Sequence, residues 1–198
     1  MKKIGFIGAY DKTDLIIYIS RILVQEGLKV LIIDATTLQK TRYTVPCIEP
    51  SRYYITTYED IDIAIGFETI QEIKNYTQNP DLDYDFILLD IDSNEEFEKY
   101  EMYSADKNYF VTAFDNYSLK KGLEIIGDSK EKMVLTKILF SAHMAPEEDE
   151  YLNFLSFYYS VKWEKEKIYF PFEVGDNTVI IRKPKECKNK LQRIKSRI

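Results

Sequence analysis

The sequence has little of the chemistry that hydrolytic triads and transition-metal sites need. Its 198 residues include a single histidine, His143, and two cysteines, Cys47 and Cys187, which lie far apart in the chain. No Ser/His/Asp triad, Cys/His pair or metal-type cysteine spacing is recognisable. We therefore expect two reduced, unpaired thiols and interpret His143 as a loop residue without a special role.

Long apolar runs are also absent. The N-terminal Met1-Lys2-Lys3 leads into only about five apolar residues, too few for a signal peptide, and no run approaches the roughly 18 residues of a spanning helix. Internal repeats and low-complexity tracts are not found either. An apolar content of 45% is enough for a packed core, and 198 residues suit one α/β domain. We expect a cytoplasmic protein.

The charge is unevenly distributed. Residues 182–198 hold eight lysines and arginines against Glu186 alone, a local charge of +7. Because the whole chain carries −6, the remaining 181 residues carry −13. An acidic body argues against a general nucleic-acid surface, so the tail is the one patch that favours anions.

Apolar runs alternate with amphipathic segments along the chain, and 35–50 reads as an irregular connection. The alternation predicts an α/β fold, a mostly parallel, doubly wound sheet with helices on both faces. Pro171 is expected to limit the last strand. The predicted strands are 3–8, 29–34, 52–56, 61–65, 86–90, 108–114, 132–140 and 167–172, and the predicted helices are 13–27, 68–78, 94–102, 116–127, 147–160 and 186–197.

Charged and polar residues follow three of the predicted strands. The first strand ends in the loop Gly8–Thr13, which closes with Lys12-Thr13 and opens an amphipathic helix. Two later strands, apolar on both faces, end in Asp34 and Asp90. Ligands of such sheets bind at the carboxyl ends of the strands, which is where all three features fall.

This arrangement resembles the MinD/ParA family of deviant Walker-type ATPases, P-loop NTPases whose loop reads K-G-G-x-G-K-[ST]. The segments Asn108–Thr112, Ser118-Leu119 and Ile168–Glu173 are similar to the family's later strand, its helix and its proline loop. The resemblance covers nearly the whole chain and implies a domain at 1–183, followed by a basic tail or amphipathic helix at 184–198.

The resemblance also implies site residues. In a working enzyme Asp34 would position the attacking water, while Thr13 and Asp90 would hold Mg²⁺, Asp90 through water. The nucleotide would contact Gly8, Ala9, Tyr10, Asp11, Lys12, Thr13 and Pro171.

The loop departs from the family pattern at three positions. Ile7 stands at the signature lysine, Ala9 at the second glycine and Asp11 at the third; Thr36 stands where a second acid is common. A carboxylate about 4–6 Å from a phosphate charge costs on the order of 3–4 kcal/mol, or about two to three decades of affinity. We therefore predict weak or absent binding of ATP and Mg²⁺, and an impaired ATPase.

Simpler interpretations stay open for these residues. Lys12-Thr13 can merely begin a helix with Thr13 as its N-cap, and Asp34 and Asp90 can be strand-end acids bonded to loop amides. The sixteen tyrosines, with clusters such as Tyr158-Tyr159, fit either the edge of a core or a protein interface.

The tail has the pattern of a basic amphipathic helix. Its apolar residues Leu191, Ile194 and Ile198 share one helical face. MinD-like proteins bind membranes through such a helix. Four interpretations of the tail stay open: contact with an anionic membrane, with an acidic protein partner or with nucleic acid, or a tail that is simply solvated. The bases around this face are Lys188, Lys190, Arg193, Lys195 and Arg197.

The function hypothesis is a degenerate, TadZ-like member of this family that positions a larger apparatus for secretion, pilus assembly or division. The resemblance implies a homodimer through the regions 8–13 and 34–42, and a cytoplasmic location with peripheral attachment at the inner face of the membrane. The alternative is an active ATPase whose ATP-dependent dimerisation controls association with membrane or DNA. Which apparatus is served is not encoded in a recognisable motif.

Overall fold

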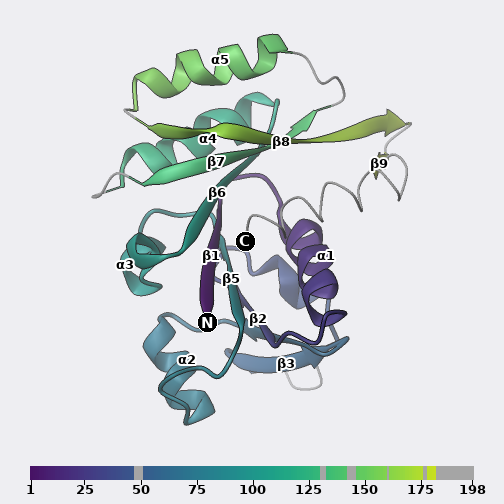
Figure 1. The fold of residues 1–198 in the computed structure, drawn as a ribbon, viewed down its shortest axis with the longest axis vertical. Helices are drawn as coiled ribbons and strands as arrows, with labels where there is room; N and C mark the ends of the chain where they lie inside the picture. Colours follow the sequence, from purple (N-terminus) through teal and green to yellow (C-terminus); the bar gives the residue numbers. More distant parts are fainter. Residues whose placement is uncertain (47–50, 130–132, 142–145, 160, 176–177, 182–198) are drawn as a thin grey trace. The chain divides into compact units, whose positions relative to one another are not determined.

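The computed structural model describes residues 1–46, 51–129, 133–141, 146–159, 161–175 and 178–181; for 141, 146–148, 171–175 and 178–181 it describes the backbone only. The chain divides into two compact units, Met1–Phe6 with Asp11–Lys107 and Ile7–Tyr10 with Asn108–Ile198 (Figure 1). The expectations for Cys47, Cys187, His143 and the tail 184–198 fall outside the described residues and stay predictions.

The first unit has a five-stranded sheet in the order β3-β4-β2-β5-β1. β2 is parallel to β4 and β5, while β3 and β4 form an antiparallel pair. Figure 1 shows α1 on one side of these strands and α2 and α3 on the other. The elements are β1 (Lys2–Ile7), α1 (Thr13–Val24), β2 (Val30–Asp34), η1 (Lys40–Tyr43), β3 (Tyr54–Tyr58), β4 (Ile61–Ile65), α2 (Ile70–Thr77), β5 (Phe86–Ile91), α3 (Glu96–Lys99) and η2 (Met102–Ser104).

Apolar patterning explains the core of this unit. All five residues of β2 are buried, as expected for a central parallel strand covered on both faces. α1 buries Leu15, Ile16 and Ile19 on one side, and the chain turns away beyond its end at Gly27, which has φ +80°. Glycine adopts this left-handed conformation without a steric penalty, as the sequence predicts for the end of a helix.

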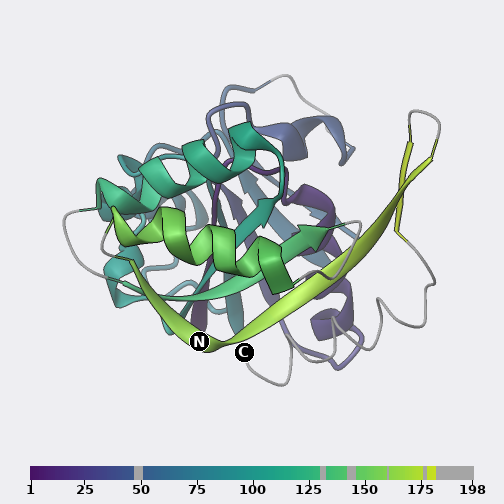
Figure 2. The same ribbon diagram turned by 90° about the horizontal axis from the view of Figure 1, so that it is seen from above.

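The second unit has the strand order β6-β7-β8-β9, in which β6, β7 and β8 are parallel and β9 is antiparallel to β8. Two neighbouring helices, α4 and α5, lie over this sheet (Figure 2). The elements are β6 (Lys107–Ala113), α4 (Asn116–Gly127), β7 (Val134–Ser141), α5 (Pro146–Phe157), β8 (Lys162–Gly175) and β9 (Thr178–Ile181). The predicted α/β class with a mostly parallel sheet is confirmed.

Two sequence-based boundaries were wrong. The last predicted strand, 167–172, is longer, because β8 continues through Pro171 to Gly175 and pairs with β9. Pro171 lies opposite Ser141, where the β7 ladder ends, and a missing N–H is tolerated at such a position. The helix predicted at 94–102 is confined to α3, because Glu101 adopts a left-handed φ of +55° that ends helical geometry.

Among the described residues no helix is both long and apolar enough to span a membrane.

A buried ion cluster joins α5 to the sheet of the second unit. Lys137 of β7 is 4% exposed, and its Nζ donates to Asp149 Oδ1 at 2.7 Å and also to Asn153. Lys167 of β8 donates to the other oxygen of Asp149. Burial by itself acts to raise the pKa of Asp149, but the hydrogen bonds from the two lysines outweigh it, so the pKa is lowered.

We predict that Asp149→Ala lowers the free energy of unfolding by about 3 kcal/mol at neutral pH, because it leaves Lys137 buried without its carboxylate. Asp149 has a lowered folded-state pKa, so its contribution exists above the unfolded pKa and disappears on acidification. Urea unfolding at a series of pH values therefore should show the gap between wild type and variant closing toward low pH. A gap that stays constant with pH would contradict this role, and Glu150→Ala is the matched surface control.

Candidate functional site

The ends of β2 and β5 bring two predicted site residues together. Asp34 and Asp90 are direct partners in the parallel register, and the ladder continues one step further, where the Ala35 N–H donates to the Asp90 carbonyl at 3.0 Å. Both side chains are buried, with 2% and 3% exposure. Two carboxylates buried side by side require cations or hydrogen-bond donors from the same region.

Lys12 supplies the cation. It precedes α1, is 2% exposed, and its Nζ lies 2.9 Å from Asp90 Oδ1. Burial raises the pKa of Asp90 to about 6; Lys12 opposes this rise and the neighbouring charge of Asp34 adds to it. The lysine predicted to contact phosphate therefore forms an ion pair with the acid predicted to hold Mg²⁺.

Asp34 is satisfied by the chain that follows it. Its Oδ1 accepts from the Thr36 N–H at 3.0 Å and from the Thr36 hydroxyl at 2.6 Å, while its Oδ2 accepts from the Thr41 N–H at 3.0 Å. These contacts of Asp34 agree with the simpler interpretation given above, in which it is a strand-end acid that accepts hydrogen bonds from loop amides. Three donors occupy most of the directions from which a carboxylate could hold an attacking water.

Asp11 occupies the beginning of α1. Its Oδ1 accepts from the Thr13 N–H at 3.1 Å, and its Oδ2 accepts from Lys40 Nζ at 3.0 Å. Although burial acts to raise the pKa of Asp11, the bonds from Lys40 and Thr13 outweigh it and lower this pKa. The free N–H groups of a helix N-terminus are where anions bind, so the chain places its own carboxylate there.

The alternative in which Thr13 caps α1 is wrong. Lys12 is at the N-cap position and Thr13 is the first helical residue, 6% exposed. The reason is that Asp11, two residues earlier, accepts from the backbone N–H of Thr13 and from its hydroxyl. The hydroxyl predicted to bind Mg²⁺ is thereby engaged within the chain.

The other half of the loop belongs to the second unit, where it serves packing. Gly8 has φ +145°, and an added Cβ would meet the Val111 carbonyl oxygen at 2.2 Å, so this position accepts only glycine. The Tyr10 ring lies 4.9 Å from the Phe140 ring. Ala9 is half-buried, and its backbone nitrogen would lie 3.8 Å from a Cβ added at Gly122.

Ile7 and Pro171 complete the predicted positions. Ile7, which stands at the signature lysine, is fully buried and cannot reach outward. The backbone of Pro171 lies in β8 opposite Ser141, and its assignment to the nucleotide stays a prediction.

A magnesium nucleotide fits this arrangement poorly. The candidate ligands of the metal, Thr13 and Asp90, are bonded to Asp11 and Lys12 respectively. A nucleotide would have to displace Asp11 before its phosphates reached the start of α1.

Sequence reasoning missed the donors around these acids. Lys40 and Thr41 lie in the stretch 35–50, which shows no periodicity, and Lys40 is 29 residues from its partner Asp11. The family pattern marks Thr36 only as the replacement of an acid, whereas Thr36 donates two hydrogen bonds to Asp34. No local signal in the sequence connects these pairs.

Comparison with solved structures identifies a MinD/ParA-like fold. A plasmid partition protein from Borrelia burgdorferi bound to AMPPNP is similar at a TM-score of 0.60 and 13% identity, over 100% of this chain and 99% of that one. The MinD protein in the MinC:MinD cell division complex of Aquifex aeolicus matches at 0.54 and 17%, over 97% and 86% of the two chains. A septum site-determining MinD from Pyrococcus horikoshii with Mg-ADP matches at 0.50 and 17%, over 96% and 85%.

No protein-family model matches the sequence, and no curated protein matches it. At these identities the structural likeness establishes the fold, not the activity.

We predict that Asp90 destabilises the folded protein as it ionises. Its folded-state pKa of about 6 lies above the ordinary aspartate value of 3.8, so its favourable contribution is complete below about pH 4 and is lost as the pH rises to about 6. The free energy of unfolding of wild type, relative to that of Asp90→Asn, should therefore fall between about pH 4 and pH 6. A flat difference from pH 4 to 7 would contradict the raised pKa; Asp92→Asn is the control.

Proposed function

We propose that this protein is a MinD/ParA-like binding and positioning module whose nucleotide loop is closed by its own side chains. It keeps the fold of a nucleotide switch but does not depend on ATP turnover. It acts through protein contacts, as a dimer that recruits or places a larger assembly of the secretion, pilus or division type.

One observation carries this proposal, the position of the Asp11 carboxylate. It accepts from the Thr13 N–H at the start of α1 and pairs with Lys40. An anion of the chain itself and its counter-cation therefore lie where the proposal places the phosphates. The Lys12–Asp90 ion pair is compatible with the same conclusion, because the buried lysine already has a carboxylate partner. An incoming triphosphate must compete with both contacts.

The structural neighbours support the partner part of the proposal. The Aquifex aeolicus neighbour is seen in a complex with MinC, and the Borrelia burgdorferi neighbour is a plasmid partition protein. We propose dimerisation through the region around 8–13 and 34–42, and attachment to a partner or an anionic membrane through the tail.

The alternative function is an active ATPase whose ATP-dependent dimerisation switches it between the cytoplasm and a membrane or DNA. Its support is that two neighbours hold AMPPNP and Mg-ADP, and that Lys12, Asp34 and Asp90 lie together at the ends of β2 and β5. The two functions differ in one measurable quantity, the affinity of the wild-type protein for magnesium ATP.

Calorimetric titration with magnesium ATP should show no binding by wild type below millimolar concentration. Replacing Asp11 by asparagine or glycine removes the competing charge and should tighten binding by about 100-fold, as expected for one like-charge contact. Adding Lys12→Ala to either variant should abolish the gain. Asp14→Asn removes an exposed charge from the same helical turn and is the matched control, with no expected change.

Micromolar binding by the wild type that is lost on Lys12→Ala would overturn the proposal and support the ATPase. An Asp11→Asn variant that binds no better than Asp14→Asn would show that Asp11 is not what closes the loop.

A further inference from the structure

An aromatic ridge runs along the outward side of α5 in the second unit. Tyr151, Phe154 and Tyr158 recur at the spacing i, i+3, i+7, and their exposed fractions are 46%, 60% and 72%. Phe157, at 81%, lies beside them. The rings are in contact, since Phe154 and Phe157 each meet Tyr158 edge-on at centroid distances of 5.9 and 6.1 Å.

The inward side of the same helix is already used. Asp149, Leu152 and Ser156 follow the same spacing and are buried against the sheet. The ridge is therefore a second apolar face of α5, in addition to the face that packs on the sheet. In a monomeric protein the outward side of such a helix is normally polar. Contiguous exposed aromatic side chains are typical of a surface that contacts another segment.

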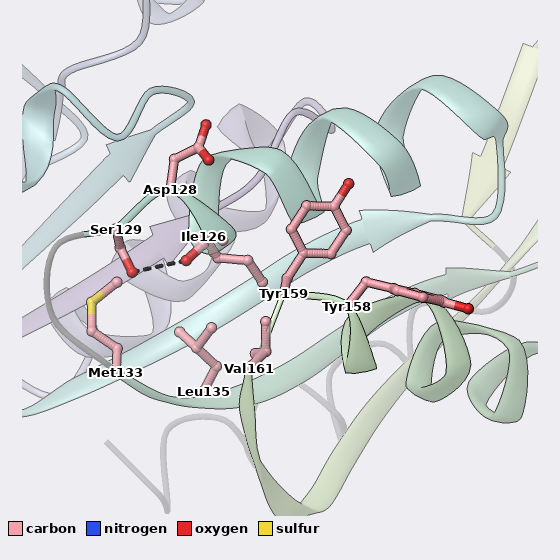
Figure 3. Close-up of a pocket in the computed structure, with 9 residues that line it drawn as sticks. Ile126, Asp128, Ser129, Met133, Leu135, Tyr158, Tyr159 and Val161 are labelled. Atoms are coloured by element: carbon pink, nitrogen blue, oxygen red, sulfur yellow. Dashed lines mark hydrogen bonds between the residues drawn. The ribbon is translucent and has the colours of Figure 1, made fainter.

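The ridge ends at a pocket. Beyond the last turn of α5, Tyr158 and Tyr159 border a hollow of about 370 Å³ together with Asp128, Met133 and Leu135 (Figure 3). Asp128 follows the carboxyl end of α4, where the helix dipole favours positive charge. Aromatic rings beside a carboxylate are suited to the side chains of lysine and arginine.

We propose that the ridge binds the chain's own basic tail, residues 184–198, in the same molecule. The tail's apolar residues Leu191, Ile194 and Ile198 have the spacing i, i+3, i+7, which matches the spacing of Tyr151, Phe154 and Tyr158. The bases around that face complement Asp128 at the pocket and the exposed Glu150 at the beginning of α5.

The strand register makes this contact possible within one molecule. Ser141, the last residue of β7, lies opposite Pro171, and Ile181, the last residue of β9, lies opposite Phe172. The end of β9 and the end of β7, after which the chain enters α5, thus lie at the same level on the two sides of β8. Both α5 and β9 run opposite to β8, so a tail that continues along β9 travels in the direction of α5.

The lengths agree as well. The twelve residues of α5 span about 18 Å, and the seventeen residues that follow Ile181 span about 25 Å as a helix or about 55 Å when extended. Either form reaches from the beginning of the ridge to the pocket. This inference does not involve the nucleotide loop. It concerns the same tail for which attachment to a partner or a membrane is proposed above, and such attachment requires the tail to leave the ridge first.

The test uses the full chain with Cys47→Ser, which leaves Cys187 in the tail as its single thiol. A benzophenone maleimide on Cys187 is irradiated, and mass spectrometry identifies the captured peptide in the monomer band. The expected result is capture of the peptide that contains residues 150–158. Replacing Phe154 and Phe157 by serine should lower its yield about tenfold or more, because two phenyl contacts are lost.

Tyr43→Ser is the matched control, since Tyr43 is an aromatic residue of the first unit with 85% exposure. It should leave the capture yield unchanged, and circular dichroism should confirm that all three proteins fold. Capture only in a dimer band would assign the ridge to a second copy and overturn the proposal. Capture of other peptides, or equal yields from the control and the double variant, would overturn it as well.

Discussion

The buried ion pair between Lys12 and Asp90 is the contact on which the candidate site depends. A lysine that is 2% exposed requires a carboxylate at hydrogen-bond distance, and the parallel register of β2 and β5 supplies Asp90 with Asp34 beside it. Removing one member of such a pair typically costs 3–5 kcal/mol, because the other charge stays buried.

Each of the four charged side chains at this edge finds its partner within the chain. Lys12 pairs with Asp90, Asp34 accepts from Thr36 and Thr41, and Asp11 bridges the start of α1 and Lys40. A nucleotide site requires the opposite condition, namely free N–H groups and a cation that await phosphate. The MinD/ParA-like fold is present, while the donors at this edge are directed to acceptors of the same chain.

Much of the fold could be predicted because its signals are local. The uninterrupted apolar runs of β2 and β5 and the apolar stripe of α1 identify their elements within a few residues of sequence. Pro171 misled the prediction of the last strand, because its tolerance depends on which neighbouring ladder ends there. The pairing of β8 with β9 depends on tertiary contacts, which the periodicity of apolar residues along the sequence does not indicate.

The positions of the candidate side chains were predictable, but their hydrogen-bond and ion-pair partners were not. Strand ends located Asp34 and Asp90, and the loop pattern located Lys12 and Thr13. The partner of the Asp11 carboxylate could not be predicted, because its position in the sequence is consistent both with repulsion of a phosphate and with attraction to Lys40. Lys40, the ion-pair partner of Asp11, lies 29 residues away in a segment without a recognisable periodicity. Long-range electrostatic pairs of this kind require coordinates.

The measurement that tests the account most directly is the amide resonance of Thr13 in ¹⁵N-labelled wild-type protein. If the Asp11 carboxylate accepts from the Thr13 N–H, the chemical shift of this amide should change as Asp11 ionises, at a pH below the ordinary aspartate range. The same shift should not respond to millimolar magnesium ATP. A Thr13 resonance that ignores Asp11 ionisation and moves in a saturable manner with nucleotide would contradict the account.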